Sequence, residues 1–170
     1  PTNDLADGKY KIKVVAVDNA GNTSAPEAAA TSYHLDTTPP SVPGTFVNPT
    51  PNPGTADNPT WTWTGCTDAS GGVGLHSSDP YEVEISADGG ATWAAAVPDT
   101  VNAASWTPSP VLSADGDYTI RVRSVDDLNN KSDWGVGGTY VFDRTVPTNP
   151  SAIIVTPASP SNNKRPTWSW

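Results

Sequence analysis

Methionine is absent from this sequence of 170 residues, cysteine occurs once and phenylalanine occurs twice. Because a disulfide needs two thiols, none can form within the chain, and we expect Cys66 to be a small core or loop residue. The sequence contains no charged-then-apolar leader and no apolar run near 18 residues. Since position 1 is proline rather than methionine, we expect the chain to be part of a longer protein.

Basic residues are also scarce. Nine Lys and Arg stand against 18 Asp and Glu, which gives a net charge of −9. Such a surface repels phosphate backbones and anionic lipid, so we expect neither nucleic acid nor membrane insertion. Only Glu27, Glu82 and Glu84 are glutamates, and the other 15 acids are aspartates. Aspartate favours turns and sites for hard cations over helix interiors.

The abundant residues are those of strands and turns. The chain has 18 Pro and 14 Gly together with many Thr and Val, and no sustained periodicity of 3.6 residues. This pattern predicts an all-β fold of many short strands joined by turns.

The sequence repeats itself. "DGKYKIKVVAVDNAGNTS" at 7–24 matches "DGDYTIRVRSVDDLNNKS" at 115–132 with an offset of 108, and "YHLDTTPP" at 33–40 matches "YVFDRTVP" at 140–147 with an offset of 107. "PTWTW" at 59–63 returns as "PTWSW" at 166–170, again 107 residues later. An offset of about 107 residues fits one β-sandwich domain, so the repeat indicates a tandem array.

The repeat divides the chain into three parts. We expect residues 1–38 to be the C-terminal part of one repeat, 39–145 to be a complete repeat, and 146–170 to be the N-terminal part of the next. Neither end piece can close a sandwich alone. We favour a chain that continues into neighbouring repeats over end-to-end association of pieces from adjacent molecules.

The complete repeat contains seven predicted strands, near 44–48, 59–64, 81–86, 91–97, 103–107, 117–126 and 138–143. Their alternation places the side chains of Trp61 and Trp63 on one face of their strand and threonines on the other. Strand 81–86 has Glu82 and Glu84 facing outward, and strand 117–126 has outward arginines. Since these two strands neighbour each other in such sandwiches, we expect the opposite charges to pair.

Residues 112–134, "LSADGDYTIRVRSVDDLNNKSDW", resemble the F-strand region of fibronectin type III and bacterial immunoglobulin-like repeats. There a Leu six residues before a Tyr packs beneath a tyrosine corner; Leu112 and Tyr118 fit this spacing, whereas Leu5 and Tyr10 are five apart. The segment 17–43 is similar to the end of one bacterial immunoglobulin-like repeat and the linker to the next. The resemblance implies a seven-stranded immunoglobulin-like sandwich in an extracellular or cell-surface protein, such as an adhesin, a surface-layer protein or an enzyme spacer.

"SADGGATW" at 86–93 resembles the Asp-box of sialidase-type β-propellers, in which the Asp caps a hairpin turn and the Trp packs beneath it. This chain has one copy and no arginine cluster for a substrate carboxylate, so we interpret the motif as a hairpin between two strands. His34 and His76 have no partner at metal spacing, and no nucleophile elbow or phosphate loop is present. We therefore expect no catalytic activity and no required cofactor.

Seven tryptophans raise the hypothesis of sugar binding. Trp61 and Trp63 are assigned to the core by their alternation, while Trp93, Trp106 and Trp134 are less constrained. We expect Trp134 to stack on the face that carries the outward arginines. The long loop 65–80 is rich in Gly and Ser, which is typical of a binding loop or of a contact with the neighbouring domain.

Among the possible ligands, calcium is the one that the residue types favour most. In a seven-stranded sandwich, the loops after the second and sixth strands lie at the pole where the preceding domain enters. Five oxygen-bearing side chains are therefore expected near one another at this junction, which would suit one Ca²⁺: Asp36, Asp68, Asp126, Asp127 and Asn129. The alternative is that these turn residues bond only their own backbone, since no D-x-[DN]-x-[DN]-G run is present.

The opposite pole offers a second such site, where Asp115, Asp117 and Asp143 are expected to meet. The linkers "DTTPPSVPG" and "DRTVPTNPS" are rich in proline, which favours short, stiff joints. We expect the chain to be a structural repeat of a stalk or filament, whose partners are neighbouring repeats. The alternatives are a module that binds glycans or a surface protein, and a spacer of a secreted enzyme.

Overall fold

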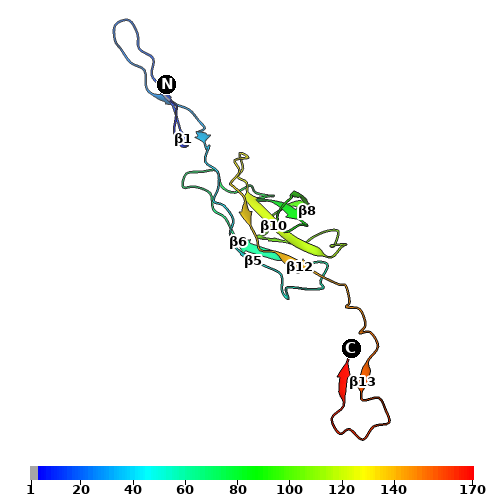
Figure 1. Cartoon of the computed structure of the whole chain (residues 1–170). Helices are drawn as coiled ribbons and strands as arrows, with labels where there is room; N and C mark the ends of the chain where they lie inside the picture. The colour runs from blue at the N-terminus through cyan, green and yellow to red at the C-terminus, as the bar shows by residue number, and fades with distance from the viewer. Residues whose placement is uncertain (1–3) are drawn as a thin grey trace.

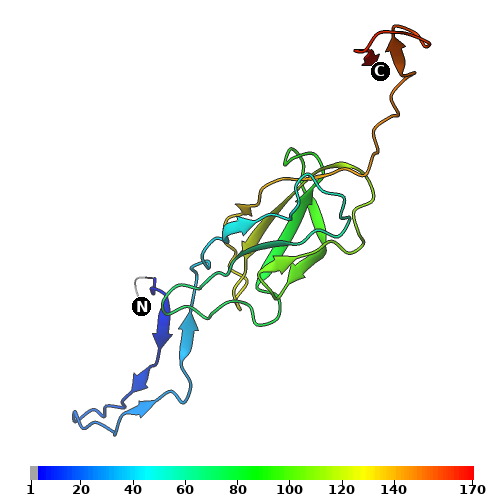
Figure 2. The same cartoon turned by 90° about the horizontal axis from the view of Figure 1, so that it is seen from below.

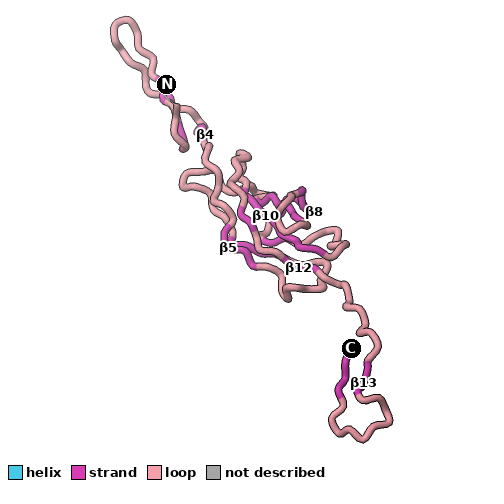
Figure 3. The backbone as a smooth tube through the Cα atoms, in the orientation of Figure 1, coloured by secondary structure: helices cyan, strands magenta, loops and turns pink. Residues whose placement is uncertain are grey.

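The computed structural model describes residues 4–170. A central sandwich carries one hairpin at each end, so that the molecule is elongated (Figures 1 and 2). All regular elements of the described residues are strands, joined by long loops (Figure 3). The described part of the chain has no helix with the length and apolar character needed to cross a membrane. The prediction of an all-β fold is confirmed.

Two sheets form the central sandwich. One has the order β5 (Gly44–Val47), β6 (Trp61–Thr64) and β9 (Ser105–Trp106). The other has the order β11 (Gly135–Val136), β10 (Gly116–Ser124), β7 (Tyr81–Ser86) and β8 (Ala94–Val101), with β12 (Tyr140–Phe142) also paired to β10. The last predicted strand, 138–143, is observed as β12, and the short strand β11 precedes it outside the predicted bounds. With those two counted together, the sandwich has the seven strands that the sequence predicts.

The paired tryptophans of β6 lie in the core, as their alternation predicts. Trp61 is 0% and Trp63 is 5% exposed, whereas the threonines between and after them are exposed. The Trp61 ring packs against Tyr140 at a centroid distance of 6.0 Å, and the Trp63 ring packs against Tyr81 at 5.4 Å. Cys66 is buried beside them, and this burial raises the pKa of its thiol.

Trp106 belongs to the same core, so its description as less constrained was wrong. It is 2% exposed, its ring centroid lies 5.7 Å from that of Trp61, and its Nε1 donates to Pro98 O at 2.8 Å. The register of β6 against β9 places Trp106 directly opposite Trp61. A ring buried in this way cannot offer its face to a sugar.

Charged and aromatic side chains cover the outer face of β7 and β10. Glu84 pairs with Arg121 at 2.5 Å and Glu82 with Arg123 at 2.7 Å, across the predicted ladder. The Arg121 guanidinium lies over the rings of both Trp93 and Trp134, at 4.8 and 4.7 Å. Arg123 also lies over Trp134, at 4.5 Å, as the sequence predicts. We call this row Trp93, Arg121, Trp134 and Arg123 the indole–guanidinium stack.

The turn between β7 and β8 has the hydrogen bonds of a capped hairpin. Asp88 Oδ1 accepts from the backbone N–H of Thr92 at 2.9 Å and from the Ser86 hydroxyl at 2.6 Å. The Thr92 hydroxyl donates to Asp88 Oδ2 at 2.6 Å. Hydrogen bonds from Ser86 and Thr92 hold the pKa of the Asp88 carboxyl well below its usual range. The turn thereby positions Trp93 in the indole–guanidinium stack.

The N-terminal hairpin reproduces the last strands of the sandwich. It contains β1 (Gly8–Tyr10), β2 (Lys13–Val14), β3 (Glu27–Ala28) and β4 (Tyr33–Leu35). Tyr10 opposes Tyr33 as Tyr118 opposes Tyr140, and the other pairs of the two ladders correspond in the same way. The repeat in the sequence is therefore also a repeat in strand register.

The C-terminal hairpin reproduces the first strands of the sandwich. It consists of β13 (Ile154–Thr156) and β14 (Thr167–Ser169). Ile154 opposes Ser169 in this hairpin, as Val47 opposes Thr62 in the sandwich 107 residues earlier. Both end hairpins thus have the strand pairing of the complete repeat without its second sheet.

Candidate metal centre

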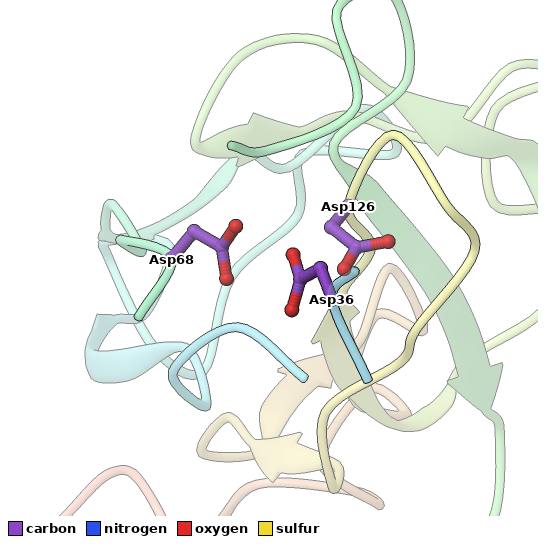
Figure 4. A group of neighbouring side chains, drawn as sticks. All are labelled: Asp36, Asp68 and Asp126. Atoms are coloured by element: carbon purple, nitrogen blue, oxygen red, sulfur yellow. The ribbon is translucent and has the colours of Figure 1, made fainter. Parts of the chain in front are cut away.

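Three aspartates meet where the N-terminal hairpin joins the sandwich (Figure 4). Asp36 follows β4, Asp68 lies in the loop after β6 and Asp126 follows β10. One carboxylate oxygen from each lies within 4.8 Å of the others. Asp36 is 5% and Asp126 is 0% exposed, and Asp68 is half-buried. We call these three side chains the junction aspartates.

Backbone amides orient the junction aspartates. Asp36 Oδ2 accepts from the N–H of Val73 at 2.7 Å, so the linker is bonded to the loop of the sandwich. Asp68 Oδ2 accepts from the N–H of Gly74, also at 2.7 Å. The turn after β10 closes on Asp126, whose Oδ1 accepts from the N–H groups of Leu128 and Asn130 at 2.8 Å each.

Asn130 links the two sides of the junction, a role that sequence reasoning did not assign. Its Nδ2 donates to Asp126 Oδ2 at 2.7 Å and to Asp36 O at 3.2 Å. Asn22 occupies the corresponding position of the N-terminal hairpin and donates to Asp18 Oδ2 at 2.8 Å. The recurrence of Asn22 at Asn130, 108 residues later, is the sequence signal that could have identified Asn130 in place of Asn129.

Gly72 and His34 complete the contact between the hairpin and the sandwich. A Cβ at Gly72 would lie 2.3 Å from Asp68 Oδ2 and 3.0 Å from Asp36 Oδ2, so a larger residue there would force a carboxylate to shift. His34 Nε2, from β4, donates to Gly71 O at 2.7 Å. The loop after β6 therefore folds against the linker.

No basic side chain balances the junction aspartates within residues 4–170. The ion pairs of this part of the chain join Lys or Arg to Glu82, Glu84 and Asp57. Amide dipoles offset only part of three carboxylate charges, and charges removed from water repel strongly. A divalent cation with oxygen ligands is the group that such an arrangement would stabilise.

The sequence hypothesis also included Asp127, which is not among the carboxylates that converge here, and Asn129, whose backbone shapes the turn after β10. Asp127 Oδ1 accepts from the N–H of Ser77 at 3.0 Å. Asn129 has a φ of 69° and donates its backbone N–H to Asp126 O at 3.1 Å, so its role is to turn the chain. Both residues shape the loops that carry the junction aspartates.

The structure does not bring Asp115, Asp117 and Asp143 together as a metal cluster, at least within residues 4–170. Asp115 instead accepts from the N–H of Arg144 at 3.0 Å and from the Thr145 hydroxyl at 2.5 Å. Asp143 Oδ1 accepts from the N–H of Thr145 at 2.9 Å, and the backbone of Asp117 pairs with Asp88. The side chains of Asp115 and Asp143 thus bond to the start of the second linker.

Comparison with known proteins finds a similar sequence in a longer protein. No protein-family model matches the chain. It is 33% identical over 162 residues to exoglucanase B of Cellulomonas fimi, an alignment that covers 88% of this chain. The chain spans 14% of the length of that relative, so the similarity concerns one part of a much longer protein.

Proposed function

We propose that this chain is a structural repeat module of a long extracellular protein, in which sandwiches stacked end to end hold other parts of the protein apart. The observation that carries the proposal is the shared strand register of the two end hairpins and the central sandwich. A unit that recurs along a chain with its pairing intact has the organisation of a tandem array. The proposal includes no catalytic role.

The linkers support a stiff array. Asp7 Oδ1 accepts from the Thr37 N–H at 3.0 Å, and the Thr38 hydroxyl donates to Oδ2 at 2.5 Å. Asp115 makes the corresponding bonds to Arg144 and Thr145 in the next repeat. Each linker is thus clamped to the sandwich or hairpin that it leaves, and the prolines that follow restrict its backbone.

We also propose that the junction aspartates hold one Ca²⁺. Asp36, Asp68 and Asp126 supply carboxylate oxygens, the ligand type that Ca²⁺ takes, and the remaining ligands of its six to eight would be carbonyl groups and water. A cation held there would join the linker of one repeat to two loops of the next. It would therefore stiffen the joint rather than take part in a reaction.

A second context for the same role is a spacer in a secreted multidomain enzyme. The similarity to one part of exoglucanase B favours it, because the matched region is 14% of that protein. A spacer of this kind would separate units that act on a polymer. The role of this chain is structural in both contexts, so they differ only in what the array carries.

The remaining alternative is a module that binds glycans or a surface protein. Against it, Trp106 is buried, and two guanidinium groups lie over the Trp134 ring. A sugar that stacked on Trp134 would have to displace one of them. Specific glycan binding by the whole chain on an array, lost on Trp134→Ala, would favour this alternative over a purely structural role.

Small-angle X-ray scattering of the whole chain tests the structural proposal. We expect an elongated particle in Ca²⁺. In excess EDTA the joint loses its cation, so the maximum dimension should differ more widely from molecule to molecule. Asp36→Asn should resemble the EDTA state in both conditions, whereas Asp127→Asn, a matched change outside the cluster, should behave as wild type. A compact particle in which the hairpins fold back on the sandwich would contradict the proposed array.

A further inference from the structure

The connection between β5 and β6 borders a cavity of about 380 Å³ on the sandwich. Its walls come from both ends of this connection, from Thr60 and Thr62 in and beside β6, and from Tyr140 of β12. A volume of this size lies within the range of about 300–1,000 Å³ that is typical of small-molecule sites. Four other hollows of the described residues are smaller, between 140 and 260 Å³ each.

Hydrogen bonds hold the walls of this cavity in place. Asn48 Oδ1 accepts from the Gly138 N–H at 3.0 Å, and the Tyr140 hydroxyl donates to Ala56 O, also at 3.0 Å. The backbone at Gly138 approaches Asn48 so closely that a Cβ there would lie 2.0 Å from Asn48 Nδ2. The side chain of Asn48 is therefore fixed by contact with glycine as well as by its bond.

The connection itself is bonded along β12. Asn52 Nδ2 donates to Thr139 O at 2.7 Å, and Asn52 Oδ1 accepts from the Val141 N–H at 2.9 Å. The N–H of Gly54 donates to Val141 O at 2.9 Å. The cavity is thus formed by the fold before any ligand binds, as is usual for small-molecule sites.

None of the described residues that line the cavity is charged, although the whole chain carries a net charge of −9. The polar groups of the lining are side-chain amides and hydroxyls, from Asn48, Asn58, Thr60 and Thr62. Val47, which is 59% exposed, and two prolines add apolar surface. A charged ligand would find no opposite charge here. A purely apolar ligand would leave the amides and hydroxyls without hydrogen-bond partners.

We propose that this cavity binds one or two rings of a neutral saccharide. Sugar hydroxyls both donate and accept hydrogen bonds, as amides and hydroxyls of the wall do. The C–H groups on the face of a sugar ring pack against the valine and proline surface. Such binding needs no exposed aromatic ring, so it agrees with the burial of Trp106. The cavity includes none of the junction aspartates, so it adds a role that does not depend on the proposed cation.

Nuclear magnetic resonance titration of the ¹⁵N-labelled whole chain in EDTA tests the proposal. The probes are cellotriose, mannotriose and xylotriose, with trigalacturonate as a charged comparison. At least one neutral trisaccharide should shift the amide signals of Asn48, Asn58 and Thr62, with a Kd of about 1 mM or lower. Trigalacturonate should bind about tenfold more weakly or worse, because its carboxylates would be desolvated without a partner. No shift with any neutral trisaccharide at about 20 mM would overturn the proposal, and so would equal binding of trigalacturonate.

Matched variants assign the binding to this cavity. Thr62→Val removes one hydroxyl but keeps the β-branched shape, and Asn58→Leu removes one amide. Each should raise Kd about fivefold through the loss of a hydrogen bond. Thr64→Val, on the same face of β6 but outside the cavity, should bind as wild type.

Wild-type affinity in both Thr62→Val and Asn58→Leu would contradict the proposal. Signals that shift only around Trp134 would also contradict it, because they would place the sugar on the other sheet. Neither result would affect the structural role, which scattering by wild type and Asp36→Asn tests separately.

Discussion

Asp36 and Asp126 lie with carboxylate oxygens within 4.8 Å of each other, although one belongs to the linker and the other to the sandwich that the linker enters. Asn130 bonds to both, through the side chain of Asp126 and the carbonyl of Asp36. The joint between hairpin and sandwich is thus a polar contact with excess negative charge. Its properties should respond to cations, and those of the sandwich core should not.

Calcium should raise the thermal stability of the joint. Removal of Asp126 charge by Asp126→Asn should abolish the difference in Tm between millimolar Ca²⁺ and excess EDTA, because one of three carboxylate ligands is lost. Differential scanning calorimetry of the whole chain measures this difference. Asp127→Asn serves as the matched control and should retain it. Equal Tm values for wild type with Ca²⁺ and with EDTA would remove the cation from the account.

Gly72→Ala should weaken Ca²⁺ binding. The added Cβ would lie 2.3 Å from Asp68 Oδ2, so Asp68 would have to move away from Asp36. We expect a rise in Kd of about tenfold, equivalent to about 1.4 kcal/mol, by isothermal titration calorimetry. Gly65→Ala is the control, since its Cβ would meet nothing closer than the Tyr81 hydroxyl at 3.5 Å. Unchanged affinity in Gly72→Ala would place any bound ion elsewhere.

The two equivalent tryptophans should differ in their effect on stability. Trp61→Ala removes a fully buried indole and should lower the free energy of unfolding of the sandwich by about 3–5 kcal/mol. Trp168→Ala removes an exposed indole and should change it by less than about 0.5 kcal/mol. Urea unfolding of the two variants and of wild type compares them. Similar losses from both would show that the C-terminal hairpin is buried in the same chain.

The indole–guanidinium stack should stabilise the outer sheet. Arg121→Ala loses the ion pair with Glu84 and the contacts with Trp93 and Trp134, and we expect about 1–2 kcal/mol of destabilisation in urea. Arg121→Lys should retain only part of this energy. The lysine keeps the positive charge, but its ammonium group cannot bond to Glu84 through two nitrogens. Arg165→Ala, in an exposed loop, should be neutral. If Arg121→Ala were equally neutral, the stack would have no role in stability.

Acid should destabilise the capped turn and the linker clamps. Hydrogen bonds lower the pKa of Asp88, Asp7 and Asp115 in the folded chain, so each bond set contributes stability above the unfolded pKa of about 4. This contribution is lost as pH falls through the lower folded value. Asp88→Asn should reduce the slope of stability against pH below about 4. Unfolding by urea between pH 2 and pH 6 measures the slopes.

Much of the fold could be predicted because strand faces follow a period of two. The alternation in β6 placed Trp61 and Trp63 in the core, and the pairing of Arg121 with Glu84 followed from neighbouring strands. Trp106 was misjudged because β9 has only two residues, too few for alternation to show which face is buried. Short strands take their orientation from the sheet that they join.

The candidate site could be predicted only in part. Asp36, Asp68 and Asp126 were expected together because the topology of a seven-stranded sandwich brings their loops to one pole. Whether Asp127 and Asn129 could join the cluster depends on the path of the turn after β10. Asn129 takes a φ of 69° in this turn. Backbone hydrogen bonds decide such paths, and they leave no periodic signal in the sequence.

Pulsed electron spin resonance on the whole chain, in the Cys66→Ala background, tests the central claim most directly. Nitroxide labels at Thr23→Cys in the N-terminal hairpin and Asn102→Cys in the sandwich report the distance across the joint. A stiff array predicts one narrow distance distribution in Ca²⁺ that broadens in EDTA. A broad distribution in both conditions would contradict the account, because the hairpin and the sandwich would then move as independent units.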